Sequence, residues 1–359
     1  MDPQNIQLVI NLAQLLLVLI FILVSVNLYL VFRLKDIDPF AKWNANDING
    51  KLFLVFLVVG LIAAFVSAGA WADMYILVKN PASEHGVKID QMMINTTIVS
   101  VLVVLVTNSL LFYYAYRYRG TGNRKALYYA DNNRLELIWT LVPAVVMAVL
   151  VFDGARVWYN IMLTDPPQEA VHIELNGKQF EWTIRYPGAD LTFGDAQVRY
   201  IDEVNANSLG FNFEDKNGHD DLVVAELLLP VNEPIALTIR SRDVLHSATL
   251  PHFRVKMDAV PGMPTHFWFK PTKTTAEMRR ETGNPEFNYE MSCQQICGNA
   301  HYNMRRIVVV ETREDYNAWL AKQKPFYETW KSLQPQDAAS VEPTQPEAGG
   351  AETAISMNE

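Results

Sequence analysis

The chain has 359 residues, of which 50% are hydrophobic, and a formal net charge of −9 at pH 7. Several of the negative charges lie in the segment 334–359, which has no Lys or Arg, and no basic stripe occurs elsewhere, so nothing indicates nucleic-acid binding. The two cysteines, Cys293 and Cys297, are too few and too close together for a disulfide framework. No Cys-x-x-Cys-His motif is present, so the chain attaches no c-type haem of its own.

Long apolar segments dominate the sequence before about residue 162. A helix needs roughly 20 apolar residues to cross the hydrocarbon core of a membrane. We predict four membrane-spanning helices: two additional ones within 1–91, and a hairpin within 92–162. The apolar runs that carry them are 7–32, 52–71, 92–116 and 137–152. The fourth run is short and is expected to continue through Trp158, with Pro143 tolerated inside the helix.

The basic residues of the loops orient these helices. They concentrate in the first and third loops, which places both loops in the cytoplasm and both termini on the outer side of the membrane. We expect this membrane to be the inner membrane of a bacterial cell, with the termini on its periplasmic side. The residues concerned are Arg33, Lys35, Lys42 and Lys51 around the first loop, and Arg117, Arg119, Arg124, Lys125 and Arg134 around the third. A cleaved signal peptide is the alternative for the first run, but the N-terminus lacks the cationic segment of such peptides.

The segment 163–311 changes to short β-rich runs that are broken by Gly, Pro, Asn and Asp. The expected strands are 171–175, 179–186, 222–229, 235–241, 266–270 and 306–311, with a polar insertion at 205–221. Short strands without intervening helices predict an antiparallel all-β sandwich or barrel of cupredoxin size. The segment 312–333 is expected to be one terminal helix that begins at Thr312, and the acidic tail 334–359 is expected to be disordered.

A compact set of soft metal ligands lies near the end of this β region. Cys293 and Cys297 are four residues apart, His301 follows four residues later, and Met304 three residues after that. A second imidazole must come from elsewhere, and His246 follows a predicted strand. Thiolate and thioether ligands select copper, whereas a structural zinc site has no use for a methionine.

The number of ligands favours two copper ions over one. A single blue-copper centre uses two His, one Cys and a weak axial Met, which leaves one cysteine over in this chain. Two thiolates can bridge two copper ions, each of which then takes one His and one weak ligand. Met304 would serve one ion and a backbone carbonyl of the 293–297 loop the other. A disulfide between Cys293 and Cys297, a zinc site and an ordinary loop histidine at position 246 remain as alternatives.

Four segments resemble subunit II of cytochrome c oxidases: 134–143, 243–247, 256–262 and 293–304. The resemblance extends over about 92–311 and implies a membrane helix hairpin followed by a cupredoxin domain of Greek-key type. It implies a binuclear copper A centre at His246, Cys293, Cys297, His301 and Met304, with the carbonyl oxygen of Gln295. The implied function is to accept electrons from a c-type cytochrome and pass them to the oxygen-reducing subunit I, coupled to proton translocation.

The chain departs from this family at three places. Glu is usual at position 295 and helps to bind magnesium at the subunit interface, so Gln295 puts that magnesium ion in doubt. The family commonly has Trp where this chain has Phe180, which leaves Phe180 or Trp182 as the residue that receives electrons; simple aromatic packing is the alternative. The family usually has two membrane helices, so the two leading helices of this chain are additional. We expect them to pack against another subunit of a larger assembly. The cytochrome donor can be permanently attached within that assembly.

Glu136 lies at the cytoplasmic start of the last predicted helix. The resemblance implies that it marks the start of a proton path into the catalytic subunit, and the alternative is a solvated helix end. Oxygen reduction itself needs haem in another subunit, because the membrane segments lack the several histidines of such a site. A stand-alone membrane-anchored copper protein and a copper chaperone or sensor are the competing functions.

Overall fold

The computed structural model of the chain describes residues 3–35, 44–72, 80–122 and 124–334. The expected disordered tail therefore lies outside the described residues, apart from its first residue. The chain divides into two compact units. The first consists of Met1–Met74 and Asn95–Ala144, and the second of Tyr75–Ile94 and Val145–Glu359.

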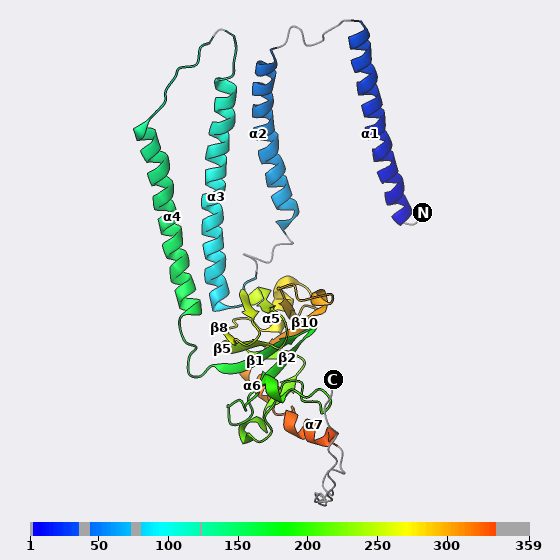
Figure 1. Cartoon of the computed structure of the whole chain (residues 1–359), viewed down its shortest axis with the longest axis vertical. Helices are drawn as coiled ribbons and strands as arrows, with labels where there is room; N and C mark the ends of the chain where they lie inside the picture. Colours follow the sequence, from blue (N-terminus) through cyan, green and yellow to red (C-terminus); the bar gives the residue numbers. More distant parts are fainter. Residues whose placement is uncertain (1–2, 36–43, 73–79, 123, 335–359) are drawn as a thin grey trace, which may run out of the picture. The chain divides into compact units, whose positions relative to one another are not determined.

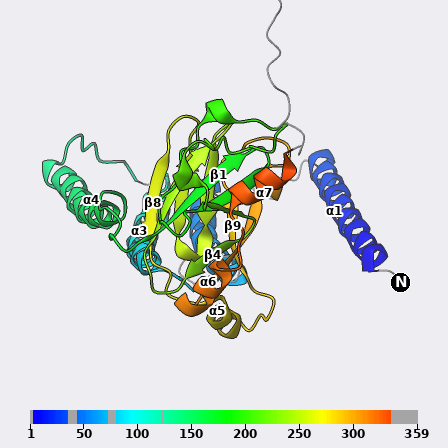
Figure 2. The same ribbon diagram turned by 90° about the horizontal axis from the view of Figure 1, so that it is seen from below.

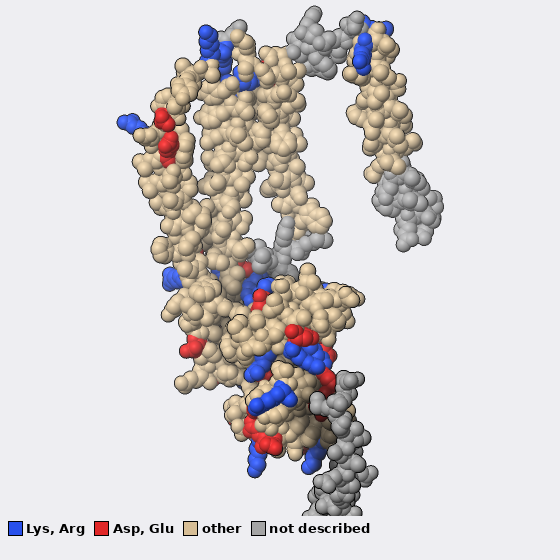
Figure 3. Space-filling model, in the orientation of Figure 1, with Lys and Arg blue, Asp and Glu red and all other residues tan. Residues whose placement is uncertain are grey.

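Four long helices account for the apolar half of the chain (Figure 1). They are α1 (Pro3–Leu34), α2 (Ala45–Ala70), α3 (Glu84–Arg117) and α4 (Asn133–Met162). Each of the four is long and apolar enough to cross a membrane. Figure 3 shows that Lys and Arg gather near helix ends and leave the helix centres without charge. The helix α4 is longer than the apolar run that predicted it and contains Pro143.

Helices α2 and α3 contact each other within the first unit. The rings of Phe53 and Phe56 lie 5.8 and 5.7 Å from the ring of Phe112. Near the charged ends of the two helices, Nε of Arg119 donates to the Asp47 carboxylate at 2.8 Å. This combination of aromatic packing and an ion pair joins α2 to the first helix of the predicted hairpin.

The second unit contains two five-stranded sheets. One has the strand order β3-β2-β1-β5-β8, and the other has β4-β10-β9-β6-β7. Their strands are β1 (Val171–Lys178), β2 (Glu181–Tyr186), β3 (Leu222–Val224), β4 (Leu227–Pro230), β5 (Ile235–Ser241), β6 (His246–Leu250), β7 (Val255–Ala259), β8 (Thr265–Phe269), β9 (Tyr289–Cys293) and β10 (Arg305–Glu311). This cupredoxin-like β domain confirms the predicted fold class, but β1–β5 and β4–β10 are parallel pairs, so a purely antiparallel arrangement was wrong.

Several predicted elements differ from the structure. The run 222–229 is two strands in different sheets, because the chain leaves one sheet after Val224 and joins the other at Leu227. The strand expected from residue 179 begins at Glu181, after a turn. The sequence did not predict β6, β7 and β9, nor the helix α5 (Thr275–Thr282), which begins with a capping box between Thr274 and Glu277.

The expected terminal helix is interrupted. It consists of α6 (Arg313–Leu320), capped by Thr312 as predicted, and α7 (Phe326–Leu333), and Pro325 precedes the second helix. Proline lacks the backbone N–H that a continuous helix requires, which explains the break. Figure 2 shows α5, α6 and α7 around the strands of this unit.

A long excursion, residues 187–221, separates β2 from β3 and begins earlier than the predicted polar insertion. A buried charge network holds it. The Arg185 guanidinium is 1% exposed, its Nε donates to the Asp221 carboxylate at 3.1 Å, and it also donates to the Gly194 carbonyl. The same carboxylate accepts the Gly194 N–H at 3.0 Å. Arg185 on β2 thus joins two points of the excursion, Gly194 and its last residue Asp221, to the sheet.

The first turns of α3 belong to the second unit and are bound to the sandwich. The N–H of Ala82 donates to the carbonyl of His252 at 2.8 Å. The Arg254 guanidinium forms a bidentate pair with Asp90, at 2.8 and 2.7 Å, and both side chains are buried. Bidentate Arg–carboxylate pairs fix orientation as well as distance. The start of α3 is therefore a rigid part of the β unit.

Candidate metal centre

Two neighbouring strands position the predicted ligands. His246 is the first residue of β6 and Cys293 is the last residue of β9. These strands are antiparallel neighbours, with Ala248 opposite Cys293, so the pairing brings the two side chains together. After Cys293 the chain forms a loop that returns at Met304, whose carbonyl accepts the Cys293 N–H at 3.1 Å. Cys297 and His301 lie within this loop.

The side chains of the predicted set converge on the two thiols. Nδ1 of His246 lies 3.8 Å from Sγ of Cys293, and the carbonyl oxygen of Gln295 lies 3.2 Å from the same sulfur. Sγ of Cys297 lies 3.5 Å from Nδ1 of His301 and 3.3 Å from Sδ of Met304. The ligand atoms of His246, Cys293 and Cys297 all lie within 4.8 Å of one another. The structure thus brings together all six positions that the sequence singled out.

The cluster lies just below the surface. His246 is completely buried, Met304 is 1% exposed, and the two cysteines are 7% and 6% exposed. Among the ligand side chains only His301 is half-buried. Both cysteines are free thiols. Burial, and then the charge of Cys293 nearby, raise the pKa of the Cys297 thiol to about 11.

Asp243 fixes the orientation of the His246 ring. Its Oδ1 lies 2.8 Å from Nε2 of His246. With Nε2–H donated to the carboxylate, Nδ1 is the ring nitrogen that faces Cys293 and is free to bind a metal. Burial opposes ionisation of Asp243, but hydrogen bonds from the Gln179 N–H, the His246 ring and the Val244 N–H lower its pKa overall. The carboxylate is therefore an anion beside the ligand.

Gln179, in the β1–β2 turn, contacts both ligand-bearing loops. Its backbone N–H donates to Oδ2 of Asp243 at 2.7 Å, and its side-chain amide donates to the carbonyl of Cys297. Gly177, two residues earlier, lies against the His246 ring. A Cβ atom added there would lie 3.1 Å from Cδ2 of His246 and 3.0 Å from Cζ3 of Trp182. Only glycine fits this position without displacing a buried ring.

The two aromatic candidates occupy different environments. Trp182 is 1% exposed, and its ring makes an edge contact with His246 at 5.9 Å between centroids. Phe180 is half-buried, and its ring packs against Gly298, in the loop between Cys297 and His301. Trp182 is thus a core residue beside one ligand, whereas Phe180 lies at the edge of the ligand loop.

The other predicted residues lie away from the donor set. The carbonyl of Gln295 faces Cys293, but the Gln295 side chain is exposed. Glu136 is exposed in the first turn of α4, which is part of the first unit.

The sequence reasoning missed Asp243, Gln179 and Gly177 as supports of the site. An acid three residues before a candidate ligand is a recognisable signal for Asp243. No local pattern marks Gln179 or Gly177, because their contacts cross the sandwich from β1 to β6 and to the loop after β9.

The donor set fits copper. Two thiols, a thioether, two imidazoles and one carbonyl oxygen form a soft, mostly buried set at one place, and thiolate with thioether favours copper. The second ring nitrogen of His246 is hydrogen-bonded to a carboxylate, as is usual for a metal-binding histidine.

The comparisons with known proteins agree with this geometry. Residues 171–312 match the family described as cytochrome C oxidase subunit II, periplasmic domain, and residues 70–155 match its transmembrane domain. The chain is 37% identical over 216 residues to the alternative cytochrome c oxidase subunit 2 of Bradyrhizobium diazoefficiens, a match that covers 60% of this chain and 72% of the relative. It is 26% identical over 252 residues to cytochrome c oxidase subunit 2 of Cereibacter sphaeroides, covering 68% and 78%.

Among solved structures, the periplasmic domain of cytochrome oxidase subunit II (CoxB) of Bradyrhizobium japonicum matches 46% of this chain and 96% of that chain, with 25% identity and a TM-score of 0.29. The two family matches, the relative at 37% identity and the cysteine–histidine cluster agree. The chain belongs to the cytochrome c oxidase subunit II family, the members of which are components of an oxidoreductase complex.

Proposed function

We propose that this chain is the electron-accepting subunit of a proton-translocating haem-copper oxidase, with a binuclear copper A centre. His246, Cys293, Cys297, His301, Met304 and the carbonyl oxygen of Gln295 would hold two copper ions. The observation that carries the proposal is the convergence of two free thiols with an imidazole beside each of them. When bound, the copper pair supplies one-electron transfer.

The surface around the cluster supports contact with a protein donor of electrons. Four apolar side chains of the ligand-bearing loops are exposed: Val244, Leu245, Ile296 and Tyr302. Ile296 is 85% exposed and Tyr302 is 78% exposed, although each is adjacent in sequence to a predicted ligand. Exposed apolar side chains at this density mark a site of protein association. We infer that a c-type cytochrome docks here, with Phe180 at the edge of the contact and Trp182 beneath it.

The membrane part supports a place within an assembly. The proposed arrangement puts the copper domain on the periplasmic side of the bacterial inner membrane, and the basic loops support its place on the non-cytoplasmic side. Helices α3 and α4 form the hairpin that would contact the catalytic subunit I, with Glu136 at the start of a proton path. Helix α2 packs on α3, which leaves α1 and the outer side of α2 for a further subunit. Magnesium at the interface is not part of the proposal, because Gln295 offers a neutral amide in place of a carboxylate.

Electron paramagnetic resonance of the oxidised, copper-loaded full chain tests the centre. A pair of copper ions that share one unpaired electron gives a seven-line hyperfine pattern, which we expect. A four-line pattern of a single copper ion, or the absence of a signal after copper loading, would contradict the two-copper assignment.

Purification of the chain from its native membrane tests the assembly. We expect haem-containing subunits to copurify with it and the complex to oxidise a reduced c-type cytochrome. A copper-loaded chain that is pure and free of haem would instead indicate a stand-alone electron carrier. The spectroscopic and the purification results are independent, so the copper centre and the oxidase assignment can fail separately.

A further inference from the structure

A cavity of about 260 Å³ lies on the opposite face of the β1–β5 sheet from the core. Residues alternate across a strand, so Ile173 and Leu175 face the core while Glu174, Asn176 and Lys178 face the cavity. The excursion 187–221 forms the other wall of this partly open cavity, with the apolar residues Ala196, Val198, Ile201 and Leu209 and the polar residues Gln197 and Ser208. One wall is therefore polar and charged, and the other is mostly apolar.

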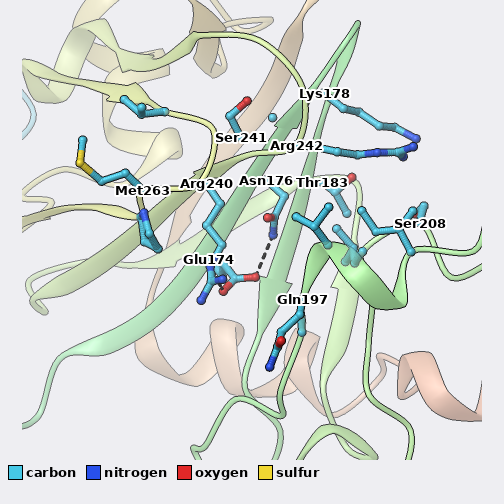
Figure 4. Close-up of a pocket in the computed structure, with 18 residues that line it drawn as sticks. Glu174, Asn176, Lys178, Thr183, Gln197, Ser208, Arg240, Ser241, Arg242 and Met263 are labelled. Carbon is cyan, nitrogen blue, oxygen red and sulfur yellow. Dashed lines mark hydrogen bonds and ion pairs between the residues drawn. The ribbon is translucent and has the colours of Figure 1, made fainter.

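The charged wall of the cavity carries three cationic side chains, Lys178, Arg240 and Arg242. Arg240 lies opposite Asn176 in the parallel β1–β5 register, and the next paired residues are Gly177 and Ser241. Lys178 and Arg242 follow directly, so two cations extend side by side from adjacent strands (Figure 4). Like charges at facing positions repel one another and are usually avoided. Their concentration at one end of the cavity makes the local potential more positive.

Only part of this positive charge is compensated inside the cavity. Glu174 is the one acid among the lining residues, and it is 4% exposed. Its carboxylate is shared between Nε of Arg240 at 2.9 Å, Nδ2 of Asn176 at 2.8 Å and the buried Arg185 at 3.5 Å. The partners of Lys178 and Arg242 are Glu181 and Glu203, which are 47% and 53% exposed, and such pairs contribute little in water. The Arg240 head group lies at Glu174, so an anion at the other end of the cavity would face two cationic side chains, Lys178 and Arg242 (Figure 4).

We propose that this cavity binds a small organic carboxylate with an apolar body. The carboxylate would lie between Lys178 and Arg242, because a guanidinium group binds a planar carboxylate through paired hydrogen bonds. The apolar body would lie against Ile201 and Leu209, apolar residues of the opposite wall. A mostly apolar pocket with a few convergent polar groups is the usual form of a small-molecule site. The proposal does not depend on copper being bound.

The cavity also borders a residue that packs against one of the predicted metal ligands. Gly177 lines it, and the same residue lies against the ring of His246. The Gly177 carbonyl accepts the N–H of Arg242, another lining residue, at 3.0 Å. A ligand that draws Arg242 inward would therefore act on the strand that contacts a proposed copper ligand.

Fluorine NMR with para-fluorobenzoate tests the site on the full chain in lipid nanodiscs. We expect saturable line broadening of the anion at millimolar concentration. Empty nanodiscs and the neutral analogue para-fluorobenzamide should show none. Equal binding of the amide, or no saturable binding of the benzoate, would overturn the proposal of an anion site.

Two variants and one control test whether the benzoate binds in this cavity. Arg242→Gln removes a cation of the wall, and Ala196→Phe fills the cavity without changing any charge. Each should weaken benzoate binding about tenfold or more, the loss typical of one charge-assisted contact or of a blocked pocket. Arg280→Gln, an exposed arginine of α5, is the matched control and should bind as the original chain does. Unchanged affinity in Ala196→Phe, with native circular dichroism, would refute the location whatever Arg242→Gln does to folding.

Discussion

The carboxylate of Asp243 and the imidazole of His246 are hydrogen-bonded through Oδ1 and Nε2 at 2.8 Å, three residues apart in sequence. The same carboxylate accepts the backbone N–H of Gln179 through its other oxygen, so it cannot rotate away from the ring without losing a second bond. The ring therefore presents Nδ1 to Cys293, and one side chain determines both the tautomer and the direction of a proposed ligand.

The first prediction follows from this pair. Asp243→Ala should lower copper affinity by about tenfold to a hundredfold, because an unsupported histidine is free to rotate and to change tautomer. Asp243→Asn should lose less copper affinity than Asp243→Ala, since the amide oxygen of Asn can still accept the Nε2–H of His246. Competition with a coloured Cu(I) chelator measures the affinities, with the exposed Glu286→Ala as the control for loss of one negative charge. Equal affinity in Asp243→Ala and the original chain would show that the carboxylate does not position the ring.

The second prediction separates bridging from axial ligands. Cys297→Ser should abolish the seven-line spectrum, because a hydroxyl cannot bridge two copper ions as a thiolate does. Met304→Leu has similar volume and replaces only a weak ligand, so both copper ions and the mixed-valence spectrum should remain. Metal analysis together with paramagnetic resonance checks both variants. Loss of copper from a folded Met304→Leu would mean that the thioether is a principal ligand.

The third prediction concerns Gly177. A methyl group there would lie 3.0 Å from the Trp182 ring and 3.1 Å from the His246 ring, and both rings are buried. Gly177→Ala should destabilise the β unit by about 1–3 kcal/mol, the usual cost of overpacking, and should change the copper hyperfine pattern. Thermal unfolding and paramagnetic resonance measure the two effects. The control is Gly60→Ala in α2, where an added Cβ meets nothing within 4 Å.

The fourth prediction concerns the excursion over the sheet. Arg185→Met leaves the buried carboxylates of Asp221 and Glu174 without their shared partner, which should cost about 3–5 kcal/mol. The loss of stability should be confined to the excursion. Native-state proteolysis within 187–221 should therefore become faster, while the proposed copper ligands remain together. Arg280→Gln serves again as the control. Cleavage of Arg185→Met at the original rate would show that the guanidinium does not hold the excursion.

The helices were predictable because a membrane imposes one strong local requirement, a long run without charge. The donor set was predictable for a similar reason: Cys293, Cys297, His301 and Met304 fall within one short segment, and soft ligands so close together have few other uses. Their second partner, His246, required the resemblance, since a lone histidine carries no local signal.

The parts that could not be predicted depend on contacts between distant segments. The run 222–229 has a continuous apolar pattern, and nothing within it shows that Leu222 and Leu229 belong to different sheets. Strand β6 begins at the ligand His246 itself and is completely buried, so it lacks the alternation that identifies a half-exposed strand. The support from Gln179 and Gly177 arises only when β1 is placed against β6 and the ligand loop.

Gln179 also bears on the order of events during assembly. By donating to Asp243 and to Cys297, it ties together the two loops that carry His246 and the thiols, through hydrogen bonds that belong to the protein alone. In small zinc domains the metal supplies the folding energy, whereas here hydrogen bonds of the protein itself connect the two loops. We therefore expect the β unit to fold before it binds a metal, so that delivery of the proposed copper ions is a separate, later step.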